Sequence, residues 1–596
     1  MIEQLILRVA NCSGFYGDRV GAAKEMVEGG PIDILTGDYL AELTMLILWK
    51  NRQRDPETGY ATSFVTQMEQ VLGTCLDKGI KIVANAGGLN PSGLARRLGK
   101  LSKELGLQPA IAYIEGDDVL SSLDNLRQTG VTMANLDTGQ TLAEASVTPV
   151  TANAYLGAWG IVDALNAGAD IVICPRVTDA SVVVGPAAWA FDWSRNDWDR
   201  LAGAVVAGHI LECGAQATGG NFSFFSEIGN PLHPGLPIAE MASDGSCTIT
   251  KHPNTGGAVT VETVTAQLLY EIDRPQYLNP DVTTHFETIK LQQSGLDRVL
   301  VRGTKGSPAP DSAKVAINYS GGYRNTVTFM LTGLNIEAKA RFVEEGLFYE
   351  AGGREQFADI DVRLIRSDHE DATSNAEAVA RLVVTVRDPD SAKVGRKFFD
   401  AATSLGLSSY PGTFSERADR QASEYGVYWP ALMPASYLDY RVILPDDSVQ
   451  SVVYPPPEAV DQLTDTIKNK NDDDVKQPIV VGNIVRAPLG TLVGARSGDK
   501  GGNANVGLWV RRPDAYPWLA SYLNVERFRE LLPEAEGMTI KRFDLPNLGA
   551  LNFVIYGLLQ EGVAASTRPD PQAKGLGEYI RSRFVDIPES LLGGNQ

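Results

Sequence analysis

Five times within the first 190 residues, a short apolar run is followed by a small polar turn and then by residues with helical periodicity. The apolar runs lie at residues 4–10, 31–36, 79–84, 109–114 and 169–174. Short buried strands that alternate with longer helices are typical of a parallel sheet with helical crossovers. Because such crossovers are right-handed, the strand-to-helix turns lie along one edge of the sheet. The pattern therefore predicts an α/β fold whose large domain is a Rossmann-like parallel sheet.

The rest of the chain divides into regions of different character. At 596 residues it needs more than one hydrophobic core. We expect a large domain over 1–455, in which extended segments such as 257–272, 283–293, 297–304 and 324–333 form an elaborated second lobe within 200–350. A proline run and the charged stretch NKNDDDVKQP predict a linker at 456–484. The order strand, helix, strand, helix over 485–590 then indicates a small α+β, ferredoxin-like domain.

Composition narrows the choice of partners. A net charge of −20 disfavours nucleic acid and anionic membranes, since Lys and Arg contacts to phosphate dominate such binding. No apolar run reaches the ~18 residues that a membrane helix needs. The five cysteines are scattered without a CxxC pair, and the five histidines show no HxH or HExxH grouping. We expect a cytoplasmic protein with a small-molecule substrate, no metal and no tightly bound cofactor.

Polar and glycine-bearing turns follow the predicted strands, where ligands of open α/β sheets bind. We expect Asp38 and Asp179 to supply acid–base chemistry. Substrate-binding candidates in these turns are Ser13, Gly14, Asn85, Gly87, Gly88, Asn90 and Arg176. The alternative is structural, because Gly and Asp often make turns and helix caps. NAGGLNP, for example, is either an anion-binding helix N-terminus or an ordinary one, and it lacks the GxGxxG spacing.

The segment GHILECGAQATGGNF (208–222) is a second candidate. On a helix, His209 and Cys213 would share a face, and an imidazole lowers the pKa of a neighbouring thiol and activates it as a nucleophile. Glu212 beside them is a candidate acid–base group, and Thr218 and Asn221 lie in a tight loop suited to substrate contact. The structural alternative is that Cys213 merely fills the core.

Two further loops combine glycine with polar side chains. The first, around HPNTGG, contains His252, a candidate substrate ligand. The second, GARSGDKGGNANVG (494–507), is too rich in glycine and charge for an ordinary strand. We interpret it as a binding or catalytic loop, with a tight hairpin as the alternative. Its candidates are Asp499 and Lys500 for catalysis, and Arg496 and Asn503 for substrate binding.

Seven motifs, in this order, resemble the acyclic terpene utilisation (AtuA) family: GFYGDR (14–19), LTGDYLAELTM (35–45), NAGGLNP (85–91), RVTDAS (176–181), GHILECGAQATGGN (208–221), HPNTGG (252–257) and ARSGDKGGNANVG (495–507). The resemblance covers nearly the whole chain and implies a long AtuA-like domain followed by a small ferredoxin-like one. It also implies a context of citronellol and geraniol breakdown, in which branched acyl-CoA esters are intermediates. One position departs from the expected HPGTGG, since Asn254 replaces a glycine.

Our leading hypothesis is an enzyme, a hydrolase or lyase, that processes a branched or β-hydroxy acyl-CoA thioester, with coenzyme A entering only as part of the substrate. A second hypothesis is cofactor-independent hydrolysis or hydration of a free ester or lactone. A third, from another class, is a non-catalytic subunit that binds acyl-CoA. We expect Asp38, Asn85, Asp179, Glu212 and Asp499 to line one cavity, in a protein that forms a homo-oligomer.

Overall fold

The computed structural model describes residues 6–416, 418–456, 458–460 and 483–592. These residues form two compact units. The first comprises the chain up to Asn318, Tyr428–Val563 and the part from Asp570, and the second comprises Tyr319–Val427 and Ala564–Pro569. The separate unit is thus centred on 319–427 and not on the predicted lobe at 200–350. Most of the predicted linker at 456–484 lies outside the described residues.

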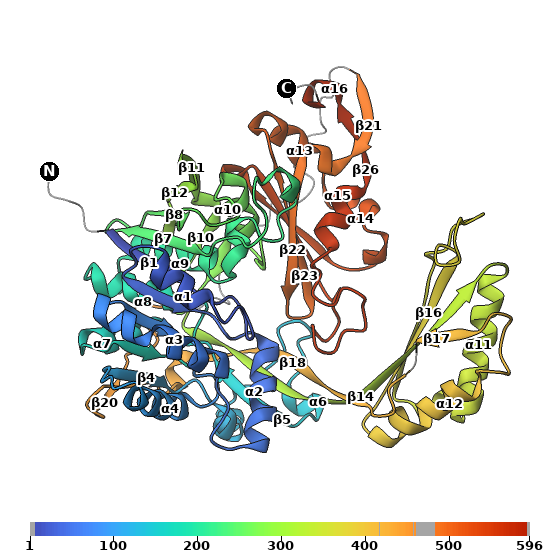
Figure 1. Ribbon diagram of the computed structural model, residues 1–596, viewed down its shortest axis with the longest axis horizontal. Helices are drawn as coiled ribbons and strands as arrows, with labels where there is room; N and C mark the ends of the chain where they lie inside the picture. Colours follow the sequence, from blue (N-terminus) through green and yellow to red (C-terminus); the bar gives the residue numbers. More distant parts are fainter. Residues whose placement is uncertain (1–5, 417, 457, 461–482, 593–596) are drawn as a thin grey trace. The chain divides into compact units, whose positions relative to one another are not determined.

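The five predicted strands form the centre of an 11-stranded sheet in the first unit (Figure 1). They are β1 (Ile6–Asn11), β2 (Ile34–Gly37), β3 (Lys81–Ala84), β4 (Ile111–Glu115) and β6 (Ile171–Ile173). All neighbours among them pair in parallel, in the order β1-β2-β3-β6-β4. The predicted parallel sheet is therefore confirmed.

Helices cover both faces of this parallel sheet, because its strands are apolar on both sides. In β3, Val83 contributes to one core, whereas Ile82 and Ala84 contribute to the other. The first core contains residues of α7 (Trp159–Asn166), α8 (Ser181–Ala190) and α9 (Trp198–Leu211). The second contains residues of α1 (Ala22–Gly29), α3 (Thr62–Lys78) and α4 (Pro91–Glu104). This arrangement makes a three-layer α/β/α sandwich.

The strand order corrects the Rossmann-like part of the prediction. In the Rossmann order 3-2-1-4-5-6 the chain reverses direction next to its first strand. Here β1, β2 and β3 progress in one direction and β6 lies between β3 and β4. Antiparallel strands extend the sheet beyond β1 and β4, and they are β7 (Pro237–Ala242), β8 (Cys247–Lys251), β12 (Arg298–Arg302), β11 (Lys290–Gly295), β19 (Arg441–Ile443) and β20 (Val449–Ser451).

The segment 257–272, which we expected to be extended, contains a helix, α10 (Val261–Leu268). Its β-branched residues favour a strand, but a capping box overrides them. The Thr260 hydroxyl accepts a hydrogen bond from the Thr263 amide at 3.1 Å, and the Thr263 hydroxyl accepts one from the Thr260 amide at 3.0 Å. Local hydrogen bonding at the N-terminus of α10 thus favours a helix in this segment.

The second unit is an antiparallel sheet with helices on one face. Its strands are β15 (Asp359–Ile365), β16 (Val379–Asp388), β17 (Phe414–Glu416), the part of β14 (Ser312–Thr332) that follows Asn318 and the start of β18 (Ser423–Pro434). Its helices are α11 (Ile336–Ala351) and α12 (Phe398–Ser404). Three arginines, Arg324, Arg363 and Arg387, donate hydrogen bonds to main-chain carbonyls of residues 565–567. These bonds hold the short C-terminal segment 564–569 within this unit.

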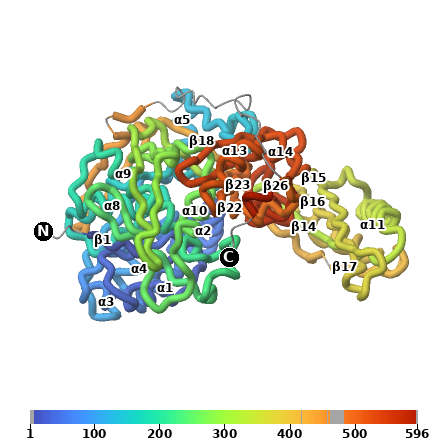
Figure 2. The backbone as a smooth tube through the Cα atoms, turned by 90° about the horizontal axis from the view of Figure 1, so that it is seen from above, coloured from blue at the N-terminus to red at the C-terminus, as the bar shows by residue number. Residues whose placement is uncertain are grey.

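The small C-terminal domain belongs to the first unit. Its sheet has the order β22 (Val493–Lys500), β23 (Asn503–Val510), β25 (Ala550–Ile555) and β24 (Ile540–Leu545). A separate core forms between this sheet and α13 (Tyr516–Tyr522), α14 (Val525–Leu531) and α15 (Leu576–Ser582). On the other face, a Cβ added to Gly507 would lie 2.4 Å from Leu269, directly after α10. Figure 2 shows β22 and β23 beside α10.

Candidate active site

Three strand-end turns place an acid, an amide and a cation together. Asp38 follows β2, and its Oδ1 accepts a hydrogen bond of 2.6 Å from Asn85, which follows β3. Arg176 follows β6 and is almost fully buried. Its Nη1 donates to the Leu40 carbonyl at 2.8 Å, and its Nη2 lies 3.0 Å from Oδ1 of Asp179. The guanidinium therefore joins the turns after β2 and β6.

Glu212 reaches the same edge of the sheet from the end of α9. Asn11, at the end of β1, donates hydrogen bonds from its side-chain amide to the carbonyls of Leu211 and Glu212, at 2.5 and 3.4 Å. Further along the same turn the packing is also close, because a Cβ added to Gly14 would lie 2.8 Å from the carbonyl carbon of Cys213. The first strand-end turn thus fixes the backbone that carries Glu212.

The hairpin between β22 and β23 supplies Asp499 and Lys500. The segment predicted as a loop is mostly strand, as the hairpin alternative proposed, and its turn uses Gly501 at a φ of +63°. Nζ of Lys500 lies 5.5 Å from the ring centroid of Tyr277, on β9 (Gln276–Leu278). The Lys500 charge acts on Glu212 and Glu271 of the large domain. The small domain therefore contributes a cation to the carboxyl groups of the large one.

Burial and mutual repulsion raise the pKa of two of these carboxyl groups. Burial raises the pKa of Glu212 well above its usual value, and the charge of Asp179 raises it further, although Lys500 and Arg176 oppose this. The pKa of Asp38 is raised well above its usual value in the same way, by burial and then by Asp179, against Arg176 and the Asn85 hydrogen bond. The site thus places acids of raised pKa beside the Arg176–Asp179 contact.

His209 is neutral and faces Glu212. Burial, with the charge of Lys500, lowers the pKa of His209 to about 4. Its Nδ1 lies 3.1 Å from Oε1 of Glu212, and since the imidazole is neutral this is not an ion pair. The other oxygen of Glu212, Oε2, is buried without a hydrogen-bond partner among the described residues. An unpartnered buried oxygen on an acid of raised pKa is available to a ligand.

Glu271 and Asp499 extend the group of acids toward the small domain. Burial raises the pKa of Glu271 to about 8, with Lys500 opposing and Glu42, Glu212 and Asp179 contributing. Burial, with the charges of Glu271 and Glu42, raises the pKa of Asp499 well above its usual value. Glu271 has a φ of +54°, which is uncommon for a residue other than glycine, and its amide donates to the Asn505 side chain at 3.0 Å. The small domain therefore holds Glu271 in position.

A further group of charged residues, which surrounds Tyr155, was not predicted from the sequence. The guanidinium of Arg176 lies 4.3 Å and Nζ of Lys314 lies 5.0 Å from the Tyr155 ring centroid. The hydroxyl of Tyr155 donates to Glu42 at 3.3 Å. Burial alone would raise the pKa of Glu42, but Lys314 and Arg176 lower it. Glu42 lies one turn after Asp38 in LTGDYLAELTM and could have been found, whereas nothing local marks Lys314.

The environment of Cys213 is the opposite of the predicted one. Helix α9 ends at Leu211, so His209 and Cys213 do not share a helical face, and the histidine faces Glu212 instead. Burial, followed by the charges of Glu212 and Glu271, raises the pKa of the Cys213 thiol well above its usual value. A neutral thiol beside acids is a poor nucleophile.

Several other candidates have structural partners. Ser13 is fully buried and accepts the Asp38 amide through its carbonyl. Two glycines are closely packed, Gly87 against Cys174 and Gly88 against Leu48. The other candidates make hydrogen bonds within the protein: Asn90 caps α4, Thr218 bonds to Ala215 and Gly235, His252 bonds to Met26, and Asn503 bonds to Asp137. Asn254 has a φ of +63°, which explains why asparagine can replace glycine in HPNTGG.

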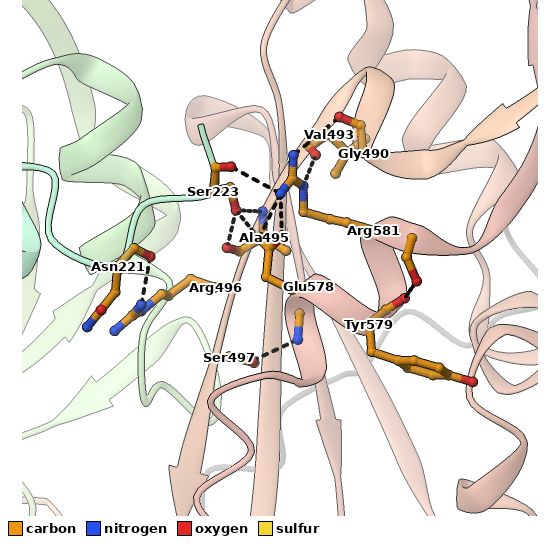
Figure 3. A network of polar contacts seen from close by, with 12 residues as sticks. Asn221, Ser223, Gly490, Val493, Ala495, Arg496, Ser497, Glu578, Tyr579 and Arg581 are labelled. Atoms are coloured by element: carbon orange, nitrogen blue, oxygen red, sulfur yellow. Dashed lines mark hydrogen bonds and ion pairs between the residues drawn. The ribbon is translucent and has the colours of Figure 1, made fainter. Parts of the chain in front are cut away.

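The small domain is fastened to the loop after α9 by a polar network (Figure 3). Ser223 bonds the main chain of Ala495 and the carboxylate of Glu578. Arg581 donates to the Ser223 carbonyl at 3.3 Å. Arg496 donates to the Asn221 carbonyl at 3.1 Å, so Asn221 contributes its backbone to this contact. The network joins the candidate residues of the two domains.

The described part of the chain shows neither a metal-binding cluster nor a membrane-spanning helix. Within the described residues, no three His, Cys, Asp or Glu side chains are grouped so as to hold a metal ion. No helix in the described part of the chain is long and apolar enough to cross a membrane.

The fold and site define a two-domain α/β protein in which buried acids meet arginine and lysine at the carboxyl edge of a parallel sheet. The model of the acyclic terpene utilisation family protein AtuA matches residues 7–444, and the AtuA ferredoxin-like domain matches residues 487–586. The chain therefore belongs to the AtuA family, whose description associates it with the utilisation of acyclic terpenes. A search of curated proteins and a search of solved structures each found no match.

Proposed function

We propose that this chain is an acid–base enzyme, a hydrolase or lyase, that acts on the carbonyl group of a branched or β-hydroxy acyl thioester. The observation that carries the proposal is that Glu212, a buried acid of raised pKa with one unpartnered oxygen, lies under the influence of the cations Arg176 and Lys500. Acyl-CoA is the thioester that the family context favours.

In this proposal the cations and the acids have different roles. Arg176, held by Asp179 and Leu40, and Lys500 stabilise the negative charge that develops on the carbonyl oxygen. Glu212 transfers a proton, because its raised pKa favours the protonated form. In hydrolysis, water adds to the carbonyl carbon, a carboxylate takes the proton of the water, and Glu212 protonates the departing sulfur.

In carbon–carbon lysis of a β-hydroxy thioester, the same groups would act in another order. A carboxylate takes the proton of the β-hydroxyl, the α–β bond breaks, and the β-carbon becomes a carbonyl. The electron pair moves into an enolate whose oxygen faces Arg176 and Lys500, and Glu212 protonates the α-carbon. The products distinguish the two reactions, since only hydrolysis releases free coenzyme A.

A panel of branched and β-hydroxy acyl-CoA esters, with the matching free esters and lactones, tests the proposal on the full chain. We expect turnover of a thioester and at least about a hundredfold lower kcat in Glu212→Gln. Asp281→Asn is the matched control, because burial also raises the pKa of Asp281, to about 6, while its carboxylate only accepts the Ala158 amide. Thermal stabilisation by acyl-CoA without turnover would overturn the enzyme proposal in favour of a binding subunit.

A further inference from the structure

Arg496 and Lys574 lie against the same aromatic ring. The guanidinium of Arg496 is 4.6 Å and Nζ of Lys574 is 4.3 Å from the ring centroid of Tyr270. Tyr270 is buried and follows α10, Arg496 is on β22, and Lys574 precedes α15. Three segments that are distant in sequence thus bring two positive charges together where the two domains meet.

Carboxylates do not neutralise this pair of charges fully. Arg496 is 9% exposed, it donates to the Asn221 carbonyl, and no carboxylate within the described ranges lies at ion-pair distance from it. Among the described residues, the ammonium group of Lys574 has one carboxyl at ion-pair distance, that of Glu271 at 3.5 Å. Since burial raises the pKa of Glu271 to about 8, that carboxyl is largely neutral at pH 7. A buried cation without a counter-charge is destabilising, which favours an anionic ligand.

The two cations adjoin the proposed acid–base groups. The charges of both Arg496 and Lys574 act on Cys213, which directly follows Glu212. Glu271 links the two parts, because its carboxyl lies 3.5 Å from Nζ of Lys574 and the charges of Lys500 and Glu212 act on it. A substrate at Glu212 could therefore extend past Glu271 and place an anionic group at Tyr270.

We propose that Arg496 and Lys574 form an oxyanion-binding subsite that holds a carboxylate or phosphate of the substrate next to the acid–base groups. This inference rests on the proposed function for its substrate, but the subsite itself can be tested by binding alone. The oxyanion has two possible sources, a phosphate of coenzyme A or the carboxylate of a free branched acid. Planar guanidinium and point-charge ammonium groups together suit either source.

Isothermal titration calorimetry on the full chain, at constant ionic strength, tests the subsite with three probes: inorganic phosphate, isovalerate and coenzyme A. We expect wild-type protein to bind at least one, and Lys574→Gln and Arg496→Gln each to weaken that binding about tenfold or more. The matched control is Lys541→Gln, since Lys541 also lies over a tyrosine ring of the small domain, at 5.1 Å from Tyr556. Binding of coenzyme A or of isovalerate alone identifies the source of the oxyanion.

The subsite and the proposed function fail separately. Lys574 is 40% exposed, so Lys574→Gln leaves folding intact and decides the test even if Arg496→Gln unfolds. Absence of wild-type binding to all three probes, or unchanged affinity in Lys574→Gln, overturns the subsite whatever the turnover. Full turnover in Glu212→Gln overturns the proposed function but leaves the binding result standing.

Discussion

Two glycine-rich segments of this protein, NAGGLNP and SGDKGGN, look alike in sequence and differ in use. In the first, a Cβ added to Gly87 would lie 2.7 Å from the Cys174 carbonyl oxygen, and one added to Gly88 would lie 2.3 Å from Leu48. These glycines allow backbone packing, and only Asn85 contacts an acid of the site. In the second, the glycines shape a hairpin that carries Asp499 and Lys500 to buried carboxyl groups. Partly buried charge distinguishes the second segment, whereas glycine content does not.

The largest effect is expected when the charge of Lys500 is removed from the second segment. Lys500→Met should lower kcat/KM about a hundredfold or more, because the lysine stabilises charge at the reacting carbonyl in the proposed function. The variant should also shift the pH profile to higher pH, since Lys500 lowers the pKa of both Glu212 and Glu271. Steady-state rates across pH check both effects. Lys500→Arg keeps the cation and should recover part of the rate, and an unchanged profile in Lys500→Met would contradict the role of Lys500.

Removing a glycine from the first segment should affect folding instead. Gly87→Ala should lower the free energy of unfolding by about 3 kcal/mol, because the new Cβ meets main-chain atoms that cannot move aside. Gly99, in the interior of α4, is the matched control, since nothing lies within 4 Å of an added Cβ. Gly99→Ala should raise the free energy of unfolding by about 0.5–1 kcal/mol. Urea denaturation measures both, and equal effects would show that close packing at Gly87 is unimportant.

Asp281 is a buried acid that lies outside both segments, so it shows how burial alone affects the pH dependence of stability. The pKa of Asp281 is raised by burial to about 6, so the folded state holds its proton more tightly than the unfolded state. Its contribution therefore makes stability fall as pH rises from about 4 to about 6, and stay level above that. Asp281→Asn should remove a fall of up to about 3 kcal/mol, seen as a flatter dependence of the unfolding free energy on pH. A parallel pH dependence in variant and wild type would contradict the raised pKa.

The smallest expected effect is at Asn254, where asparagine replaces the expected glycine. Because φ is +63° there, Asn254→Gly should change the free energy of unfolding by less than about 1 kcal/mol. Asn254→Val should destabilise by about 1–3 kcal/mol, since a β-branched residue is strained at positive φ. Thermal unfolding of both variants checks this, and equal melting temperatures would mean that backbone conformation does not select the residue.

The parallel strands were predictable because each combines a continuous apolar run with a helix directly after it. Their order was not, since no local pattern places β6 between β3 and β4. Helix α10 was mistaken for a strand because its β-branched residues outweighed the cap at Thr260. The Rossmann-like sheet was inferred from local alternation, and strand order depends on crossovers that the alternation does not specify.

The candidate site was predictable where chemistry follows a strand end directly. The structure brings Asp38, Asn85, Arg176, Asp179 and Glu212 together, and it brings Asp499 close to Glu271. Glu271, Lys314 and Lys574 were missed because their roles depend on contacts between segments far apart in sequence. Cys213 was misjudged because the end of α9 at Leu211, one residue before Glu212, removes the helical spacing on which its activation depended.

The bond between Glu271 and Asn505, together with the position of Lys500, has a consequence for the two family domains as a pair. Since both lie on one polypeptide, Lys500 is present at a high effective concentration that dilution of the protein does not change. Separately expressed halves would meet as a bimolecular encounter and lose that advantage. Covalent joining of the two domains thus secures the stoichiometry of the complete site.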